Sequence, residues 1–375
     1  FLPFQPDLNW RNPEVRQEMF DMIRMWLGRG VDGFRLDIFG SIMHDALLRD
    51  NDPRPRVVGG IPRLQTPIRT LNTVENFELA CDLRAVVDEF DGDRALLGEV
   101  FGDEAVLRNY LEHGGRPGLH MVFLFEFLAA RYSAKRYRDL ISRFEREFPD
   151  PMLPTYVVEN HDRARSLSRL GGDLDKARVL APLLMTLRGV PVVYQGQEIG
   201  MTNRYIPLRE ANDPIPGVIA RYLPEAANRR LTERLNRDEV RTPMQWTSAP
   251  HVGFCPDDVE PWLPVNDDRA TRNVEDQTGD PDSLLTLYQA LLELRRATPA
   301  LHRGTLSLRE TDVEPLVMYE REHEGERVLV VANLGDERLV VPLGAPVGDG
   351  DDWTVALSTS EHAELKNRLL LLPPH

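Results

Sequence analysis

The sequence predicts an α/β protein in which a parallel (β/α) barrel is followed by a small antiparallel β-sandwich. Three observations lead to this fold class. Helical and strand-like segments alternate up to about residue 300, which implies a parallel sheet. The strand segments are almost continuously apolar, as expected when both faces of a sheet are covered. From residue 304 onward, short β runs are separated by Gly, Asp and Pro, which is typical of a small antiparallel sandwich.

The first helix is expected to begin at Asn12-Pro13-Glu14, because Asn is a good N-cap and Pro suits the first helical position. Apolar residues keep helical spacing up to Gly28 and Gly30, which end it. A short buried strand follows at 30–38 and closes with Arg35 and Asp37. Alternate residues of a strand share a face, so the guanidinium should hold the Asp37 carboxylate ionised.

The alternation then repeats along the chain. Further helices are expected over 83–90, 103–110, 133–148, 173–188 and 281–298. Strands are expected over 95–100, 120–126, 155–162 and 190–195. A Pro-rich, charged excursion runs from about 200 to 280, and the sandwich strands are expected at 316–319, 328–332, 339–341 and 369–372.

Several of these strand segments finish on polar or ionisable residues, which are Asp37, Glu99, Glu126, His161 with Asp162, and Gln195. In a closed α/β barrel the strand C-termini meet at the face that holds the active site. An open doubly wound sheet also binds its ligand there, usually a nucleotide. Neither a GxGxxG turn after a strand nor a Walker-type loop occurs, so a barrel is favoured.

The composition, 42% hydrophobic and 28% charged over 375 residues, is that of a soluble globular protein. A net charge of −15 argues against a nucleic acid or an anionic membrane as partner. Two cysteines, Cys81 and Cys255, fit a reducing compartment, and no membrane span or signal peptide is visible. We therefore expect a cytoplasmic protein with a neutral substrate. The sequence makes no prediction of oligomeric state.

Three carboxylates, Asp37, Glu99 and Asp162, lie at strand ends about 60 residues apart and should converge on one barrel mouth. Retaining glycosidic hydrolysis needs a carboxylate that attacks and a carboxylic acid that protonates the leaving oxygen. Asp37 has Arg35 beside it, and Glu99 lies in an apolar strand that should raise its pKa. Asp162 would stabilise the cationic transition state, and His161 would donate to a sugar hydroxyl.

Spacing alone leaves three alternatives open. The same carboxylates could hold a divalent cation. They could form structural charge networks, or belong to a non-catalytic protein that binds sugars. A metal enzyme would lose activity with a chelator, whereas a glycosidase of this kind would not.

The segments that carry these groups resemble a known family. The stretch around Asp37, the Gly98-Glu99-Val100 strand end and Glu159-Asn160-His161-Asp162 resemble three consecutive signature regions of the α-amylase family, glycoside hydrolase family 13. Residues 5–9 (Gln5-Pro6-Asp7-Leu8-Asn9), 195–201 and 241–246 resemble signatures of its oligo-1,6-glucosidase and α-glucosidase subgroup. The resemblance covers nearly the whole chain.

The resemblance implies the C-terminal portion of a (β/α)8 TIM-barrel catalytic domain at 1–302 and a β-sandwich domain at 303–375. It assigns Asp37 as nucleophile, Glu99 as general acid/base and Asp162 as transition-state stabiliser. Arg35 and His161 would line the glucose subsite. The remaining two assignments stay open. Arg241 resembles an arginine that recognises the non-reducing-end glucose, or forms a surface ion pair. Ile38 resembles the residue found in α-1,6-active members, or is simply a buried strand residue.

Departures from the family pattern also shape the expectation. Five barrel strands are recognisable where the family has eight, and the first three would precede Phe1, so we expect a fragment of a longer enzyme or a chain that needs a complementing piece. The aspartate that usually pairs with the Arg241 equivalent is missing. The calcium loop found near the start of many relatives is missing too, so no metal is expected, and no cofactor is expected either. Smaller departures are Gln197, where Glu is commoner, and Glu159 before Asn160.

The expected function is that of a retaining, exo-acting α-glucosidase that hydrolyses α-1,4 and/or α-1,6 bonds of short oligosaccharides. The alternative within the family is a transglycosylase or isomerase of the trehalose or sucrose isomer synthase type. An inactive fragment or accessory protein is the other alternative, although the three carboxylates are intact. The expected partner is a small oligosaccharide, with no nucleic acid and no membrane.

Overall fold

The computed structural model describes residues 6–58, 61–63, 65–213, 236–343, 353–366 and 368–374. Gln5, which belongs to the first subgroup signature, lies outside these residues. The chain divides into two compact units. The first comprises Phe1–Ala129 and Ser142–Tyr156, and the second comprises Ala130–Ile141 and Val157–His375.

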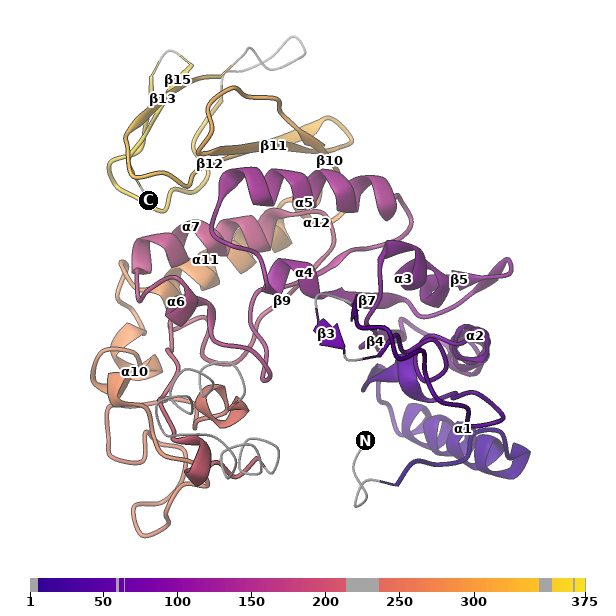
Figure 1. Cartoon of the computed structure of the whole chain (residues 1–375). Helices are drawn as coiled ribbons and strands as arrows, with labels where there is room; N and C mark the ends of the chain where they lie inside the picture. The colour runs from indigo at the N-terminus through magenta and orange to yellow at the C-terminus, as the bar shows by residue number, and fades with distance from the viewer. Residues whose placement is uncertain are drawn as a thin grey trace. The chain divides into compact units, whose positions relative to one another are not determined.

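The first unit is built on a parallel sheet with strand order β1-β4-β7-β8, of which Figure 1 labels β4 and β7. Its strands are β1 (Gly33–Leu36), β4 (Ala95–Gly98), β7 (Met121–Leu124) and β8 (Thr155–Val157). Gly33 pairs with Ala95, and a Cβ at Gly33 would lie 2.0 Å from the Ala95 carbonyl oxygen. Glycine therefore allows β1 to approach β4 this closely.

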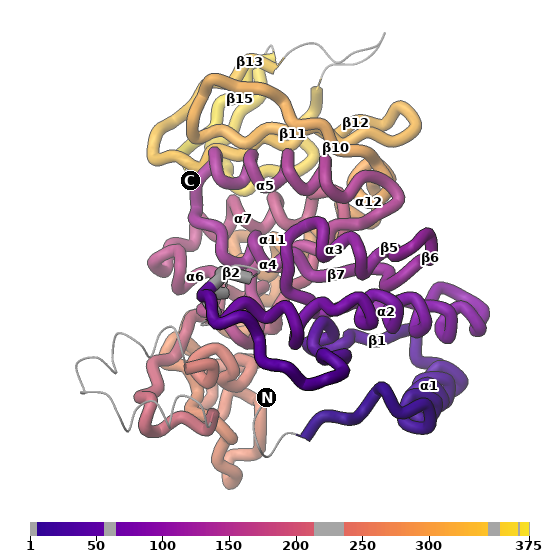
Figure 2. Tube along the Cα trace, turned by 45° about the vertical axis from the view of Figure 1, so that its right-hand side comes forward, coloured from indigo at the N-terminus to yellow at the C-terminus, as the bar shows by residue number. Residues whose placement is uncertain are grey.

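Helices alternate with these parallel strands, as the sequence pattern predicts, one before β1 and the others between successive strands. They are α1 (Pro13–Gly28), α2 (Val74–Val87), α3 (Glu104–Leu111) and α5 (Ala134–Glu147), whose residues are shared between the two units. The Asn12 side chain caps α1 by accepting from the Glu14 amide at 3.0 Å, as expected. A hairpin of β5 (Glu112–His113) and β6 (Arg116–Pro117) lies beside α2 and α3 (Figure 2).

Smaller elements of the first unit are η1 (Phe39–Ser41), β2 (Arg56–Val58), β3 (Ile61–Arg63) and α4 (Phe125–Leu128). The expected strand over 120–126 is wrong at its end, because Glu126 lies in α4. Its carboxylate forms an ion pair with Arg143 at 2.5 Å, so a positive charge on the following helix balances the negative charge of Glu126. The expected strands 155–162 and 190–195 are also too long, since β8 ends at Val157 and β9 (Val190–Val192) ends before Gln195.

The second unit contains β9, α6 (Ser166–Arg169), α7 (Leu174–Thr186), α11 (Leu284–Ala297) and α12 (Pro299–His302). The described part of the excursion between 200 and 280 holds short helical turns, which are η2 (Leu208–Glu210), η3 (Arg237–Val240), η4 (Asp267–Ala270) and α10 (Val274–Gln277). These turns carry residues of the candidate site.

The C-terminal sandwich is confirmed as two three-stranded antiparallel sheets, drawn in orange and yellow (Figure 1). One is β10-β11-β12 and the other is β13-β15-β14. Their bounds are β10 (Thr305–Leu308), β11 (Leu316–His323), β12 (Glu326–Asn333), β13 (Leu339–Pro342), β14 (Glu364–Lys366) and β15 (Leu369–Leu372). Leu316, Val341 and Leu343 are buried between them.

A fully buried arginine joins the β10-β11-β12 sheet to the helices that precede it. Arg321 on β11 donates to the carbonyl oxygens of Leu301 and Gly304 at 2.8 Å and of Thr305 at 3.0 Å. It also reaches the Thr186 carbonyl of α7 at 2.5 Å. These bonds cap the ends of α7 and α12. A domain boundary at 302 stays a prediction.

In the described residues the parallel strands form an open sheet, so the barrel is not closed. None of the helices in the described ranges is long and apolar enough to cross a membrane.

Candidate active site

The first group of candidate residues lies where β1 and β4 end. Leu36 pairs with Gly98, so Asp37 and Glu99 follow the same point on two adjacent strands. The Glu99 amide donates to the Leu36 carbonyl, and the Phe39 amide donates to the Glu99 carbonyl, both at 2.9 Å. These two backbone hydrogen bonds hold Asp37 and Glu99 next to each other.

Arg35 links the two carboxylates. Its Nη2 donates to Glu99 Oε2 at 2.7 Å, and its Nη1 donates to Asp37 Oδ1. The expectation that Arg35 faces Asp37 is met, and the same guanidinium also contacts Glu99. A cation already bridges the two acids, so a metal ion is not needed to hold them together.

The two carboxylates differ in environment. The Asp37 side chain is 69% exposed and the Glu99 side chain 6%. Burial raises the pKa of Glu99, and a side-chain hydrogen bond with Asp37 and its charge act in the same direction. The Ile38 amide and the Arg35 charge oppose the rise. Such an environment helps Glu99 to retain a proton, as a general acid must.

Ile38 has a strained backbone. Its φ of 41° and ψ of 42° lie in the left-handed region, which is rare for a β-branched residue. The conformation directs the Ile38 amide to Glu99 Oε2 at 3.1 Å. Ile38 lies two residues beyond the end of β1, so it is a turn residue rather than a strand residue. Such strain commonly accompanies function.

Two asparagines support this turn and were missed by the sequence reasoning. The Asn76 side chain, which is buried, accepts from the Met43 amide at 2.8 Å and donates to the Gly40 carbonyl at 3.0 Å. Asn72 donates to the Phe101 carbonyl at 2.8 Å and accepts from the Tyr110 hydroxyl at 2.8 Å. Neither asparagine lies at a strand end, which is why the spacing of the carboxylates gave no sign of them.

The second group lies in the second unit, in the loop after β8 and in and directly after η3. Arg241 Nη2 donates to Asp162 Oδ1 at 2.8 Å, and Arg241 Nε donates to the His161 carbonyl at 2.9 Å. His161 Nε2 lies 3.4 Å from Asp162 Oδ2. The structure thus brings together Asp162, His161 and Arg241, which the sequence analysis had selected from distant segments.

Arg237 is a further member of this second group that the sequence reasoning missed. Its Nη1 donates to Asp162 Oδ1 at 3.1 Å, and its Nε donates to the buried Asp213 at 2.5 Å. Hydrogen bonding to Asp213 raises the pKa of Arg237, so it stays charged. Nothing in the sequence pointed to Arg237, because its partners Asp162 and Asp213 are distant in the chain. Within the described ranges, no group of three His, Cys, Asp or Glu could hold a metal ion.

Comparisons with known proteins agree with this arrangement. The family model described as alpha amylase, catalytic domain, matches residues 1–304. A probable alpha-glucosidase of Rhizobium meliloti is 36% identical over 90% of this chain and 61% of its own length. An oligo-1,6-glucosidase of Heyndrickxia coagulans is 32% identical over 95% of this chain and 66% of its own length.

Solved structures give the same result. The chain matches the alpha-glucosyl transfer enzyme XgtA with a TM-score of 0.84 and 34% identity, over 100% of this chain and 68% of the other. It matches the trehalulose synthase MutB from Pseudomonas mesoacidophila with a TM-score of 0.83 and 27% identity, over 100% of this chain and 69% of the other. The chain therefore spans about two thirds of the length of these relatives. It belongs to the α-amylase family, whose catalytic domain it matches over residues 1–304.

Proposed function

We propose that the protein is a retaining, exo-acting α-glucosidase that hydrolyses α-1,4 and/or α-1,6 glucosidic bonds of short oligosaccharides. The observation that carries this proposal is the unequal pair Asp37 and Glu99. One is exposed, the other is buried with a raised pKa, and one guanidinium holds both. Relatives named alpha-glucosidase and oligo-1,6-glucosidase support the reaction class.

The chemistry follows from the difference between the two acids. Asp37 attacks the anomeric carbon while Glu99 gives its proton to the leaving glycosidic oxygen. Glu99 then takes a proton from water, and the resulting nucleophile cleaves the ester on Asp37 and regenerates both groups. Arg35 keeps Asp37 in place through both steps.

The family resemblance assigns Asp162 the stabilisation of the positively charged transition state. Two arginines, Arg237 and Arg241, donate to one Asp162 oxygen and hold this carboxylate in place. His161 and Arg241 supply hydrogen-bond donors for glucose hydroxyls, and an arginine of this kind supports an exo mode of action. Ile38, in its strained turn, is proposed to influence linkage preference.

Transfer is the second candidate function, favoured by the structural similarity to an alpha-glucosyl transfer enzyme and to a trehalulose synthase. The same residues would form the same covalent intermediate. A sugar hydroxyl would then replace water in the second step.

One experiment separates these possibilities. The natural protein is incubated with maltose, isomaltose and sucrose beside an Asp37→Asn control, and the products are separated by chromatography. Glucose formed only by the unmutated protein supports hydrolysis and ranks the linkages, whereas new oligosaccharides or sucrose isomers support transfer. Equal turnover by the Asp37→Asn protein would refute the assignment of the nucleophile. A cytoplasmic location stays a prediction.

A further inference from the structure

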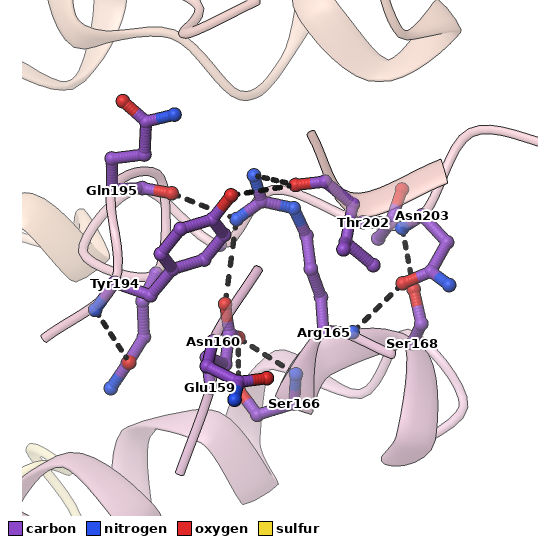
Figure 3. A network of polar contacts seen from close by, with 12 residues as sticks. Glu159, Asn160, Arg165, Ser166, Ser168, Tyr194, Gln195, Thr202 and Asn203 are labelled. Carbon is purple, nitrogen blue, oxygen red and sulfur yellow. Dashed lines mark hydrogen bonds and ion pairs between the residues drawn. The ribbon is translucent and has the colours of Figure 1, made fainter. Parts of the chain in front are cut away.

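A buried ion pair lies next to the group that contains Asp162, and the proposed chemistry does not use it. Glu159, three residues before Asp162, and Arg165, three residues after it, have side chains 1% and 0% exposed. Arg165 Nη1 lies 3.4 Å from Glu159 Oε2 (Figure 3). Glu159 also accepts from the Ser166 amide at 2.7 Å. The pair therefore spans the base of the loop that carries Asp162.

Arg165 also binds two other loops. Its Nη1 donates to the Gln195 carbonyl at 2.9 Å, and its Nη2 donates to the Val240 carbonyl at 3.1 Å. The guanidinium carbon lies 4.9 Å from the centre of the Tyr194 ring, which Figure 3 shows beside it. One planar side chain thus joins the loop after β8, the loop after β9 and the end of η3.

The bond to Val240 has a direct consequence for the site. Val240 immediately precedes Arg241, whose guanidinium binds Asp162 and the His161 carbonyl. The Tyr194 hydroxyl donates to the same Val240 carbonyl at 3.1 Å. Arg165 therefore fixes the backbone on both sides of the contact between Asp162 and Arg241.

This arrangement is poorly suited to stability alone. Burying two charges is costly, and a well-packed apolar pair is often as stable or more so. Burial raises the pKa of Glu159, whereas the Arg165 charge and the Ser166 donors act to lower it. In the described residues Arg165 Nε is buried and has no hydrogen-bond partner. The guanidinium group of Arg165 therefore contacts three loops, although one of its N–H groups makes no hydrogen bond in the described residues.

We propose that Arg165, held by Glu159, is a positioning residue that sets the placement of Asp162 and Arg241 for the sugar. This inference rests on the proposed glycosidase function. It gives a role to Glu159, a departure from the family pattern that had no explanation in the sequence. Arginine is required because a lysine ammonium is a single point charge and cannot span three loops.

The test compares a double variant, Arg165→Met/Glu159→Gln, with the control Arg321→Met in the protein as its gene encodes it. The double variant removes both charges together, so neither is left buried alone. Arg321 is also fully buried and also donates to backbone carbonyls, but it lies on β11. Thermal unfolding and the kinetics of glucose release from the preferred disaccharide are measured for each protein.

The double variant should stay folded at the assay temperature while kcat falls about 10- to 100-fold and KM rises, because displacements of about 1 Å cost this much. Arg321→Met should unfold at a lower temperature with unchanged kcat and KM. Arg165→Lys, which keeps the charge, should leave kcat reduced at least about 10-fold. Wild-type kcat and KM in the double variant, or full rescue by lysine, would overturn the inference. An inactive wild-type protein would instead refute the proposed function, and the inference with it.

Discussion

Replacing Glu99 with glutamine should stabilise the protein at neutral pH while it slows hydrolysis at least about 100-fold. Glu99 Oε2 accepts from both Arg35 and the Ile38 amide, and a glutamine oxygen can accept both bonds. The new amide group would donate to Asp37, whose charge now repels Glu99. No hydrogen bond is lost, and one buried charge is removed.

The pH dependence follows from the direction of the pKa change. A carboxyl group whose pKa is raised on folding contributes its stability at low pH and loses it as pH rises through the folded-state pKa. The contribution of Glu99 to the free energy of unfolding of the wild-type protein is therefore smaller at neutral pH than at low pH. The gain for Glu99→Gln is expected to be about 1 kcal/mol at pH 7, since the lost attraction to Arg35 offsets part of the relieved desolvation.

The assay is urea unfolding of both proteins at pH 7 and pH 4. The gain should be present at pH 7 and absent at pH 4, where Glu99 is protonated in both states. Hydrolysis should fall at least about 100-fold, the usual contribution of a general acid. A variant that is less stable at pH 7, or a gain that does not change with pH, would refute the raised pKa.

Three further predictions concern the same part of the chain. Asn76→Ala should lower the free energy of unfolding by about 2 kcal/mol, because it leaves the Met43 amide without its side-chain acceptor and removes one of the two bonds to the Gly40 carbonyl; an unchanged denaturation midpoint would contradict this. In Arg35→Met, the basic limb of kcat/KM should move to higher pH, since the Arg35 charge lowers the Glu99 pKa; a move to lower pH would oppose it. Excess EDTA should leave hydrolysis unchanged, and loss of activity restored by a divalent cation would favour a metal enzyme.

The alternating helices and strands and the C-terminal sandwich could be predicted from the spacing of apolar residues, because each of these segments has one dominant hydrophobic period. The helix over 83–90 was placed too late, since α2 begins at Val74, and its buried polar residue Asn76 weakened the apolar signal. Glu126 was assigned to a strand end, although it lies in the short helix α4 and pairs with Arg143. Local apolar composition does not distinguish a strand from a buried turn of helix.

The carboxylates and Arg35 were predictable because strand ends are where α/β folds place their chemistry. Arg237, Asn72 and Arg165 were not, since each acts through a partner distant in sequence. The left-handed backbone of Ile38 was also invisible, because a β-branched residue gives no local signal for that conformation. Tertiary contacts hold it there against its own preference.

The central claim is that Asp37 and Glu99 perform a double displacement. The most direct test follows hydrolysis of 4-nitrophenyl α-glucoside, whose leaving group is not a sugar, by ¹H NMR from the first turnover, before the released glucose mutarotates. Two inversions at the anomeric carbon predict that α-glucose appears first and that Asp37→Asn releases none. β-Glucose as the first product, or α-glucose at the wild-type rate from Asp37→Asn, would contradict the account.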